Sequence, residues 1–277
     1  MAFDLHAVAA ALLDAAPDAM FVVDDGTIVF ANEEVEKLFG YRRDELVGGP
    51  IDRLVPDAVR GRHAEYRRTY GTAPTRRAMG HFEVPARRQD GAEVWVAIGL
   101  SPLVVDGRLL VIAIAHDVTE RRRLQERLRY LGSHDALTEL YNRAYFDDEL
   151  ARLERGRLAP ISLIMIDLDR LKRTNDEEGH AAGDRLLRRT AAVLRTVFRA
   201  EDVVARIGGD EFCVVLPGVG ENDRRRAVER TRRAADVEGV EMSLGGATAT
   251  ETRGLQRALQ EADQAMYADK VSRRSGS

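Results

Sequence analysis

The stretch that decides the fold of the second half of the chain is Val203 to Pro217, VVARIGGDEFCVVLP. Two apolar runs rich in β-branched residues flank a tight Gly-Gly-Asp break, and this pattern predicts a β-hairpin. Because glycine tolerates positive φ, we expect the turn to use that freedom. Asp210 and Glu211 lie at the tip of the hairpin. Acids at such a tip can serve solubility alone, and for a lone Gly-Asp turn that interpretation would be the better one.

The two glycines favour a binding site instead. Gly208 and Gly209 remove the side chains beside the acids, so a bulky anionic ligand could approach the backbone closely. Two carboxylates can face a phosphate only if a divalent cation offsets their repulsion. Hard oxygen ligands of this kind suit Mg²⁺ or Mn²⁺.

Length and composition indicate a soluble protein of two domains. A chain of 277 residues is long for one compact core, and 44% hydrophobic with 32% charged residues is typical of globular proteins. The net charge of -4, with both signs intermixed, predicts neither a nucleic-acid partner nor a membrane anchor. The single cysteine, Cys213, alternates with core positions in a strand and is expected to be a small buried hydrophobe.

The first residues resemble no targeting segment. Residues 1–16 carry Asp4, His6 and Asp14, and no basic region precedes a long apolar run. This pattern is typical neither of a signal peptide nor of a membrane span. We therefore expect a cytoplasmic protein.

The first half of the chain reads as short strands and helices in a definite order. A helix at 2–15 precedes a hairpin around Asp24-Asp25-Gly26, and Asn32 can cap a short helix that ends at Gly40. Three short helices and then a three-stranded meander are expected to follow. The helices fall near 44–47, 51–55 and 59–70, and the strands near 81–86, 93–105 and 108–116.

This order resembles a PAS domain, over about residues 10–119 of a domain that we place at 1–119. Its familiar landmarks are Asn32, Phe39-Gly40-Tyr41, Gln89-Asp90-Gly91 and Asp117-Val118-Thr119. The resemblance implies an antiparallel sheet flanked by short helices. It also implies a sensor, but the fold alone does not identify the ligand.

His63 lies in a run, Arg60 to Tyr66, that resembles the haem-ligand helix of oxygen-sensing PAS domains. A neutral imidazole there could bind ferrous haem. Against this, Thr69 stands where those sensors often have arginine, so we favour an empty pocket or an unknown ligand over haem. No cysteine occurs in residues 1–119, which excludes a cysteinyl-flavin photosensor.

Residues 120–134 form the predicted linker. Leu124, Leu128 and Leu131 make a narrow apolar seam on a highly charged helix, which is typical of a parallel two-stranded coiled coil and hence of a homodimer. Fewer than two heptads are visible, so a helix packed on its own domain is the alternative.

The remaining residues, 135–277, closely resemble a GGDEF domain, and the chain resembles a diguanylate cyclase. The motif residues are the opening DALTELYNR at 135–143 and GGDEF at 208–212, and the likeness covers 132–274. Helices are expected at 145–155, 181–198 and 221–236, strands at 161–166 and 240–248, and a helix at the end. The domain should thus be an α/β sandwich of the nucleotidyl-cyclase type, with helices on both faces of a mixed sheet.

Asp167 ends the apolar strand, so we expect its carboxylate to emerge at the edge of the sheet. A buried acid without a partner is costly, which predicts a cation or a hydrogen-bond network beside it. The resemblance implies that Asp167, Asp210 and Glu211 hold Mg²⁺ or Mn²⁺, with a carbonyl from Leu168. Asp169 could instead cap a helix.

The resemblance also implies a GTP site. Asn175 and Asp184 would read guanine, because an amide and a carboxylate together match groups that adenine lacks. Asn175-Asp176 could alternatively form only a turn. The other residues implied for GTP are His180, Lys172, Gly208, Gly209, Lys270 and Arg274. Arg274 departs from the family pattern, since Ser272-Arg273-Arg274 replaces the usual Gly-Arg-Asn.

Arg199 and Asp202 match the RxxD inhibitory site for cyclic di-GMP, the reaction product. Arginine pairs with phosphate and aspartate with the guanine edge, so the chemistry suits that ligand. The competing interpretation is a solvent-exposed turn.

The sequence therefore predicts an enzyme that condenses two GTP into cyclic di-GMP and two pyrophosphates. Asp210 or Glu211 would deprotonate the attacking hydroxyl, and a PAS sensor and product feedback would control the rate. The alternative is an inactive module that binds GTP or cyclic di-GMP. Such modules usually lose an acid at the hairpin tip, whereas this chain keeps both. A polymerase relative would need a basic groove, and none is indicated.

Overall fold

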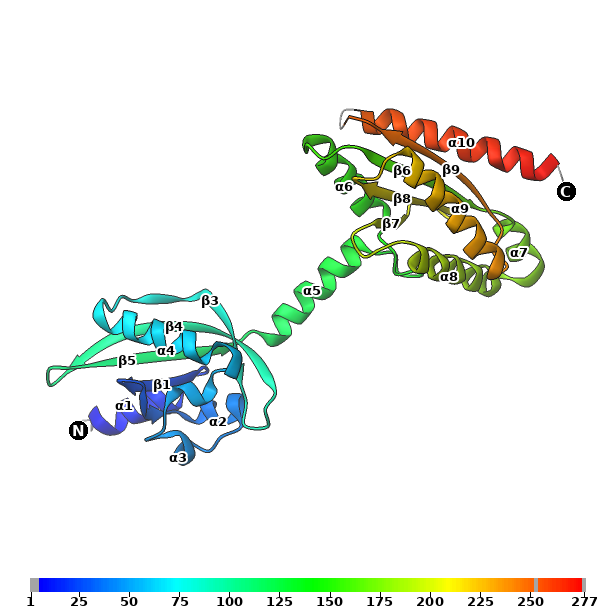
Figure 1. The fold of residues 1–277 in the computed structure, drawn as a ribbon. Helices are drawn as coiled ribbons and strands as arrows, with labels where there is room; N and C mark the ends of the chain where they lie inside the picture. The colour runs from blue at the N-terminus through cyan, green and yellow to red at the C-terminus, as the bar shows by residue number, and fades with distance from the viewer. Residues whose placement is uncertain (1–4, 252–253, 276–277) are drawn as a thin grey trace. The chain divides into compact units, whose positions relative to one another are not determined.

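The computed structural model describes residues 5–251 and 254–275 of the chain (Figure 1). These divide into two compact units, residues 1–126 and 127–277. The division falls inside helix α5 (Thr119–Ser133), the predicted linker, so the last turns of that helix belong to the second unit.

The first unit is a five-stranded sheet with short helices, as predicted from the order of its elements. Its strands are antiparallel throughout and stand in the order β2-β1-β5-β4-β3. The elements are α1 (Leu5–Asp14), β1 (Ala19–Asp24), β2 (Thr27–Ala31), α2 (Glu33–Phe39), α3 (Arg43–Leu46), η1 (Ile51–Leu54), α4 (Asp57–Thr72), β3 (Arg77–Arg87), β4 (Glu93–Val105) and β5 (Arg108–Asp117).

Helix α2 closes the core of this unit. The ring of Phe39 meets that of Phe21 on β1 edge to face, with the centroids 5.7 Å apart. The helix ends at Gly40, whose φ of 79° is a left-handed conformation that glycine adopts without strain. The predicted end of this helix is thus confirmed.

Asn32 has a different task from the predicted one. It is fully buried, and its side chain makes no capping bond to α2. Its Oδ1 accepts from the Met20 amide at 2.9 Å, and its Nδ2 donates to the carbonyls of Asp18 and Leu13 at 2.9 and 3.2 Å. The buried amide therefore ties α1 and the start of β1 to the end of β2, where it satisfies backbone groups far away in the sequence.

Helix α5 buries none of its side chains. At its start the Arg122 guanidinium lies 3.6 Å from the centre of the Trp95 ring. The leucines of the predicted seam, Leu124, Leu128 and Leu131, are 56%, 68% and 47% exposed. The alternative of a helix packed along its own domain is thus wrong for these leucines, and the coiled coil stays a prediction.

The second unit is a four-stranded sheet in the order β7-β8-β6-β9. All of its ladders are antiparallel, so the predicted mixed sheet is wrong; the parallel pairing described is one isolated bridge between Tyr141 and Ala205. The elements are α6 (Arg143–Arg155), β6 (Ile161–Leu168), α7 (Leu171–Glu178), α8 (His180–Val197), β7 (Val203–Arg206), β8 (Glu211–Pro217), α9 (Glu221–Val237), β9 (Met242–Ala249) and α10 (Leu255–Ser275).

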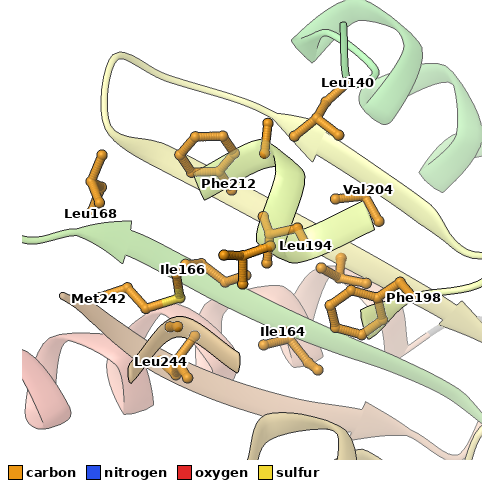
Figure 2. Close-up of a cluster of buried hydrophobic side chains, with 14 of the residues drawn as sticks. Leu140, Ile164, Ile166, Leu168, Leu194, Phe198, Val204, Phe212, Met242 and Leu244 are labelled. Atoms are coloured by element: carbon orange, nitrogen blue, oxygen red, sulfur yellow. The ribbon is translucent and has the colours of Figure 1, made fainter. Parts of the chain in front are cut away.

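Strand β6 lies inside the sheet, and every residue of it is buried, as its apolar run predicted. Its side chains alternate between two cores. Ile164 and Ile166 face the core under α8 and α9, where Phe212 and Leu194 join them (Figure 2). The opposite core takes side chains from β6 and from helices α6 and α10, including Leu163, Met165, Phe146, Ala262 and Met266. Helices on both faces of the sheet are thus confirmed.

Cys213 is fully buried in the second of these cores, as predicted. Burial raises the pKa of its thiol far above the usual range. The residue therefore acts as a hydrophobic side chain.

Helix α10 packs against β9 closely enough to leave no room for a side chain at Gly245. A Cβ atom built there would lie 1.9 Å from the Met266 amide nitrogen and 2.4 Å from the Ala262 carbonyl. This contact fixes the backbone of α10, which carries Lys270, against the sheet. None of the helices in the described ranges is both long and apolar enough to cross a membrane.

Candidate active site

The predicted hairpin of β7 and β8 is present, but its turn uses no positive φ at Gly208 or Gly209. The amides of Ile207 and Gly208 both donate to the Glu211 carbonyl, at 2.9 and 3.3 Å. A Cβ atom on Gly208 would lie 2.6 Å from Glu211 Oε2, whereas one on Gly209 would meet nothing within 4 Å. Glu211 thus folds back against Gly208, so a side chain at 208 would displace the carboxylate of Glu211, and the space beside Gly209 is open.

The sheet brings the predicted acids together. Asp167 on β6 stands directly opposite Glu211 on β8, and the Leu168 amide donates to the Asp210 carbonyl at 2.8 Å. Asp167 is 6% exposed and lies on an interior strand, so the expectation that it emerges at the edge of the sheet is wrong. The end of β6 and the tip of the hairpin form one acidic site.

The partner of buried Asp167 is Lys270, whose Nζ lies 2.6 Å from Asp167 Oδ1. Burial raises the pKa of Asp167, the Lys270 hydrogen bond opposes that rise, and the charges of Asp210 and Asp169 add to it. A cation beside Asp167 was the expectation from its burial, and Lys270 supplies one. Lys270 is also one of the residues implied for the triphosphate.

Asp169 does not cap the next helix. Its carboxylate accepts from the Ser243 hydroxyl at 3.1 and 3.0 Å. The residue at the start of α7 is Arg170, with a left-handed φ of 64°, so the helix-cap alternative for Asp169 is wrong.

These donors fit a divalent cation that arrives with phosphate. Within residues 5–251 and 254–275, no three His, Cys, Asp or Glu side chains are grouped so as to hold a metal ion. Mg²⁺, however, usually takes one or two protein carboxylates and completes its shell with water and substrate phosphates. Asp167, Glu211 and the Leu168 carbonyl supply oxygen donors of that kind at neighbouring positions.

Helix α7, which the sequence did not predict, holds Asn175 against α8. A Cβ atom on Gly183 would lie 2.0 Å from Asn175 Oδ1, so the amide rests directly on the α8 backbone beside Asp184. Asn175 is inside the helix, and the turn interpretation is wrong. Lys172 and His180 are exposed on α7 and at the start of α8. The structure thus places Asn175 against the residue that precedes Asp184, and the guanine-reading role of the two stays a prediction.

A separate cavity of about 540 Å³ lies between α7, α8 and the loop before β9. Arg170, Arg173, Arg185 and Arg189 line it with Glu241, and neither the hairpin tip nor Asn175 does. Helical spacing puts Arg173 on a different face of α7 from Asn175. The cavity is not the predicted GTP site.

One contact to the hairpin tip escaped the sequence analysis. Arg206 donates to Asp135 Oδ1 at 3.1 Å and to the Gly209 carbonyl at 2.8 Å. Burial acts to raise the pKa of Asp135, but hydrogen bonds from Thr138 and Arg206 outweigh it and leave this pKa lowered. The opening motif of the domain therefore holds the tip in place through Arg206.

The end of α5 is fastened to α6 by a column of rings. Tyr130 stacks on His134 at 4.0 Å, His134 meets Tyr141 at 4.8 Å, and Tyr141 stacks on Tyr145 at 3.8 Å. Asn142 caps α6 by accepting from the Tyr145 amide, and its Nδ2 donates to the Gly132 carbonyl at 2.9 Å. These contacts connect the end of the linker helix to the rest of the second unit.

Arg199 and Asp202 share one turn between α8 and β7. Asp202 Oδ2 accepts from the Arg199 amide at 2.8 Å, and the Arg199 side chain is 81% exposed. The Arg199 side chain is accessible to a ligand, and the product-binding role of both residues stays a prediction.

His63 lies on α4 with its Nδ1 2.6 Å from Asp52 Oδ1, and Arg67 donates to the other oxygen of that carboxylate at 2.8 Å. A carboxylate hydrogen-bonded to one ring nitrogen is a common arrangement behind a metal-ligating histidine. Haem ligation stays a prediction. The side chain of Arg274 lies outside the described residues, so its role also stays a prediction.

Comparison with known proteins agrees with this geometry. Residues 132–276 match the family described as "Diguanylate cyclase, GGDEF domain", and residues 17–120 match a PAS domain family. The chain is 36% identical over 211 residues to a probable diguanylate cyclase of Escherichia coli, DgcE, covering 74% of this chain and 19% of that protein. It is 34% identical over 284 residues to an uncharacterized signaling protein of Caulobacter vibrioides, covering 95% and 33%. The chain thus spans a third or less of the length of these two relatives.

Among solved structures, the coiled coil and GGDEF domain of DgcB from Caulobacter crescentus, in complex with c-di-GMP, superposes with a TM-score of 0.51. The identity is 29%, and the match covers 56% of this chain and 89% of that one. The chain belongs to the GGDEF family. It carries a PAS domain ahead of the GGDEF domain.

Proposed function

We propose that the protein is a diguanylate cyclase that converts two GTP into cyclic di-GMP and two pyrophosphates. The observation that supports this most is the acidic site, where Asp167 faces Glu211 across β6 and β8 and Asp210 lies next to them. An inactive GTP-binding or cyclic di-GMP-binding module would not need all three carboxylates.

Asp167, Glu211 and the Leu168 carbonyl would hold Mg²⁺ or Mn²⁺, which when bound supplies positive charge beside the phosphates. Lys172 and Lys270, with Arg274, would hold the triphosphate. Asp210 or Glu211 accepts the proton of the 3′-hydroxyl of a second GTP. The 3′-oxygen of the second GTP then bonds in line to the α-phosphorus of the first GTP. The bond from that phosphorus to the oxygen that bridges to the β-phosphate breaks, and pyrophosphate leaves. A second such step closes the ring.

Purified protein incubated with GTP and Mg²⁺ tests the proposal, with products separated by chromatography. We expect cyclic di-GMP and two equivalents of pyrophosphate, and removal of the divalent ion with EDTA should stop both. Binding of GTP or cyclic di-GMP without any turnover would instead identify the inactive module.

The guanine reading by Asn175 and Asp184 gives a first prediction. Gly183→Ala would push Asn175 away, because the new Cβ atom would overlap Asn175 Oδ1, the free end of a side chain. We expect KM for GTP to rise about tenfold with little loss of stability, since one hydrogen-bonding contact is displaced. Steady-state kinetics measure KM. Arg188→Ala, an exposed change on α8, is the control and should leave KM unchanged.

One domain holds one GTP, so two domains must face each other to close the ring, and the leucine seam of α5 would bring them together. We therefore predict that one residue inserted after Leu124 lowers the activity more than seven do, since a heptad restores the register of the seam. Equal effects of both insertions on initial rates would argue against helical coupling to the PAS sensor, whose ligand is unidentified.

Product feedback is proposed at Arg199 and Asp202. Arg199→Ala should leave the initial rate close to that of the unchanged protein while weakening inhibition by added cyclic di-GMP about tenfold, because a charged phosphate contact is lost. Rates measured over a range of product concentrations give the inhibition constant. An unchanged inhibition constant would support the alternative, in which Arg199 and Asp202 form only a solvent-exposed turn.

A further inference from the structure

The ion pair of Asp167 and Lys270 joins two residues that are 103 positions apart. Its members are well shielded from water, with side chains 8% and 20% exposed. An ion pair in such surroundings is screened much less than one on the surface. Asp167 is the most buried carboxylate of the acidic site, and Lys270 neutralises its charge effectively because little water screens the pair.

The same carboxylate is one of the proposed metal ligands. An ammonium 2.6 Å from Asp167 Oδ1 and a divalent cation on that carboxylate would repel each other strongly in a site that contains little water. Metal binding at Asp167 is thus disfavoured while Lys270 stays paired with it. Loss of the lysine without a new partner would leave a desolvated charge, which is costly.

We propose that Lys270 is an exchangeable counter-ion: it occupies Asp167 in the nucleotide-free protein and moves to a triphosphate when one binds. The site therefore excludes divalent cations until nucleotide arrives, and the metal and the nucleotide bind cooperatively. This inference rests on the proposed function, since it assigns an order of binding to the same site.

The fold suits an exchange made by a side chain alone. Gly245 holds the backbone of α10 tightly against β9, so the helix itself is not free to move. The lysine side chain, by contrast, has a flexible four-carbon stem with a rotatable ammonium group. When Lys270 leaves, the negative charges of Asp210 and Asp169 remain near Asp167 and favour a cation in its place.

The test is Mn²⁺ binding to the full chain without nucleotide, followed by electron paramagnetic resonance at about pH 8, where carboxyl groups are ionised. We expect Lys270→Met to bind Mn²⁺ at least about tenfold more tightly than the unchanged protein, because the competing charge is gone. Lys270→Gln, which can still donate a hydrogen bond to Asp167, should show the same gain and covers the case in which the methionine variant does not fold.

Two controls locate the effect. Lys172→Met removes an exposed cation of α7, whereas the ion pair described for Asp167 is with Lys270, so this change should leave the affinity for Mn²⁺ unchanged. The double variant Asp167→Asn with Lys270→Gln should not show the increased affinity for Mn²⁺. Equal affinity of the unchanged protein and the Lys270 variants overturns the proposal. So does an equal gain in Lys172→Met, or a gain that survives Asp167→Asn.

The proposed function is judged separately, by turnover of GTP in the unchanged protein. Turnover with equal Mn²⁺ affinities rejects the counter-ion role alone. A tenfold gain in the Lys270 variants without turnover rejects the cyclase activity and supports the counter-ion role.

Discussion

Glu211→Gln should retain the fold and lower cyclic di-GMP formation by about 10³-fold, the scale of loss when one preorganised electrostatic contact is removed from an active site. The glutamine has nearly the same shape and fits the space beside Gly208, but it carries no charge to bind a cation or accept a proton. Chromatography of the product over time measures the loss. Asp210→Asn should behave in the same way.

Glu201→Gln is the matched control for this experiment. Glu201 is an acid in the turn between α8 and β7, where its side chain is 70% exposed and pairs with Arg199. It should keep the rate of the unchanged protein. Near-normal product formation by both Glu211→Gln and Asp210→Asn would contradict the assignment of the acidic site.

Gly245→Ala should destabilise the second unit by ~3 kcal/mol or more, at the upper end of what overpacked cores lose. The added Cβ atom would overlap the backbone of α10 at Met266 and Ala262, and a backbone inside a helix cannot yield locally. The whole helix would have to shift, opening the core that it shares with β6. Urea unfolding followed by circular dichroism measures the change.

Gly132→Ala is the control for this substitution, since a Cβ atom there would meet nothing within 4 Å. On helix α5 it should be neutral or stabilise the protein by about 1 kcal/mol, because alanine favours helix more than glycine does. An equal loss of stability in both variants would show that the contact between β9 and α10 is not as tight as described.

Local sequence patterns predicted much of the fold. The strands of both sheets follow from runs of β-branched residues between Gly and Asp turns, and β6 follows from its unbroken apolar run. The mixed sheet was wrong because apolar runs reveal strands but not their directions. Direction depends on which strands pair, and β6 pairs with β8 and β9, far away along the chain.

Helix α7 was missed for a different reason. Its sequence LKRTNDEE has a single large apolar residue, Leu171, so no helical stripe can be read from it. It is held by tertiary contact, with Asn175 lying on the glycine at 183. Tertiary packing here outweighs local propensity.

The candidate site, like the fold, could be predicted from the sequence only in part. Motif residues at the tip and at the end of β6 were found because each occupies a fixed place beside a strand. The pairs Asp167–Lys270 and Asp135–Arg206 join residues 103 and 71 positions apart, and no local pattern announces them. Asn32 likewise looked like a helix cap, because its buried backbone partners are visible only in the folded chain.

The exposure of helix α5 bears on how the activity of the protein depends on its concentration. A helix of 15 residues that buries no side chain is marginal in water on its own. Its two ends are held by Trp95 and by the ring column from Tyr130, and the proposed pairing of two seams would stabilise the turns between them, a contribution that dilution would remove. In that case the output per chain rises with the amount of protein in the cell, so that a change in expression alters the rate more than proportionally.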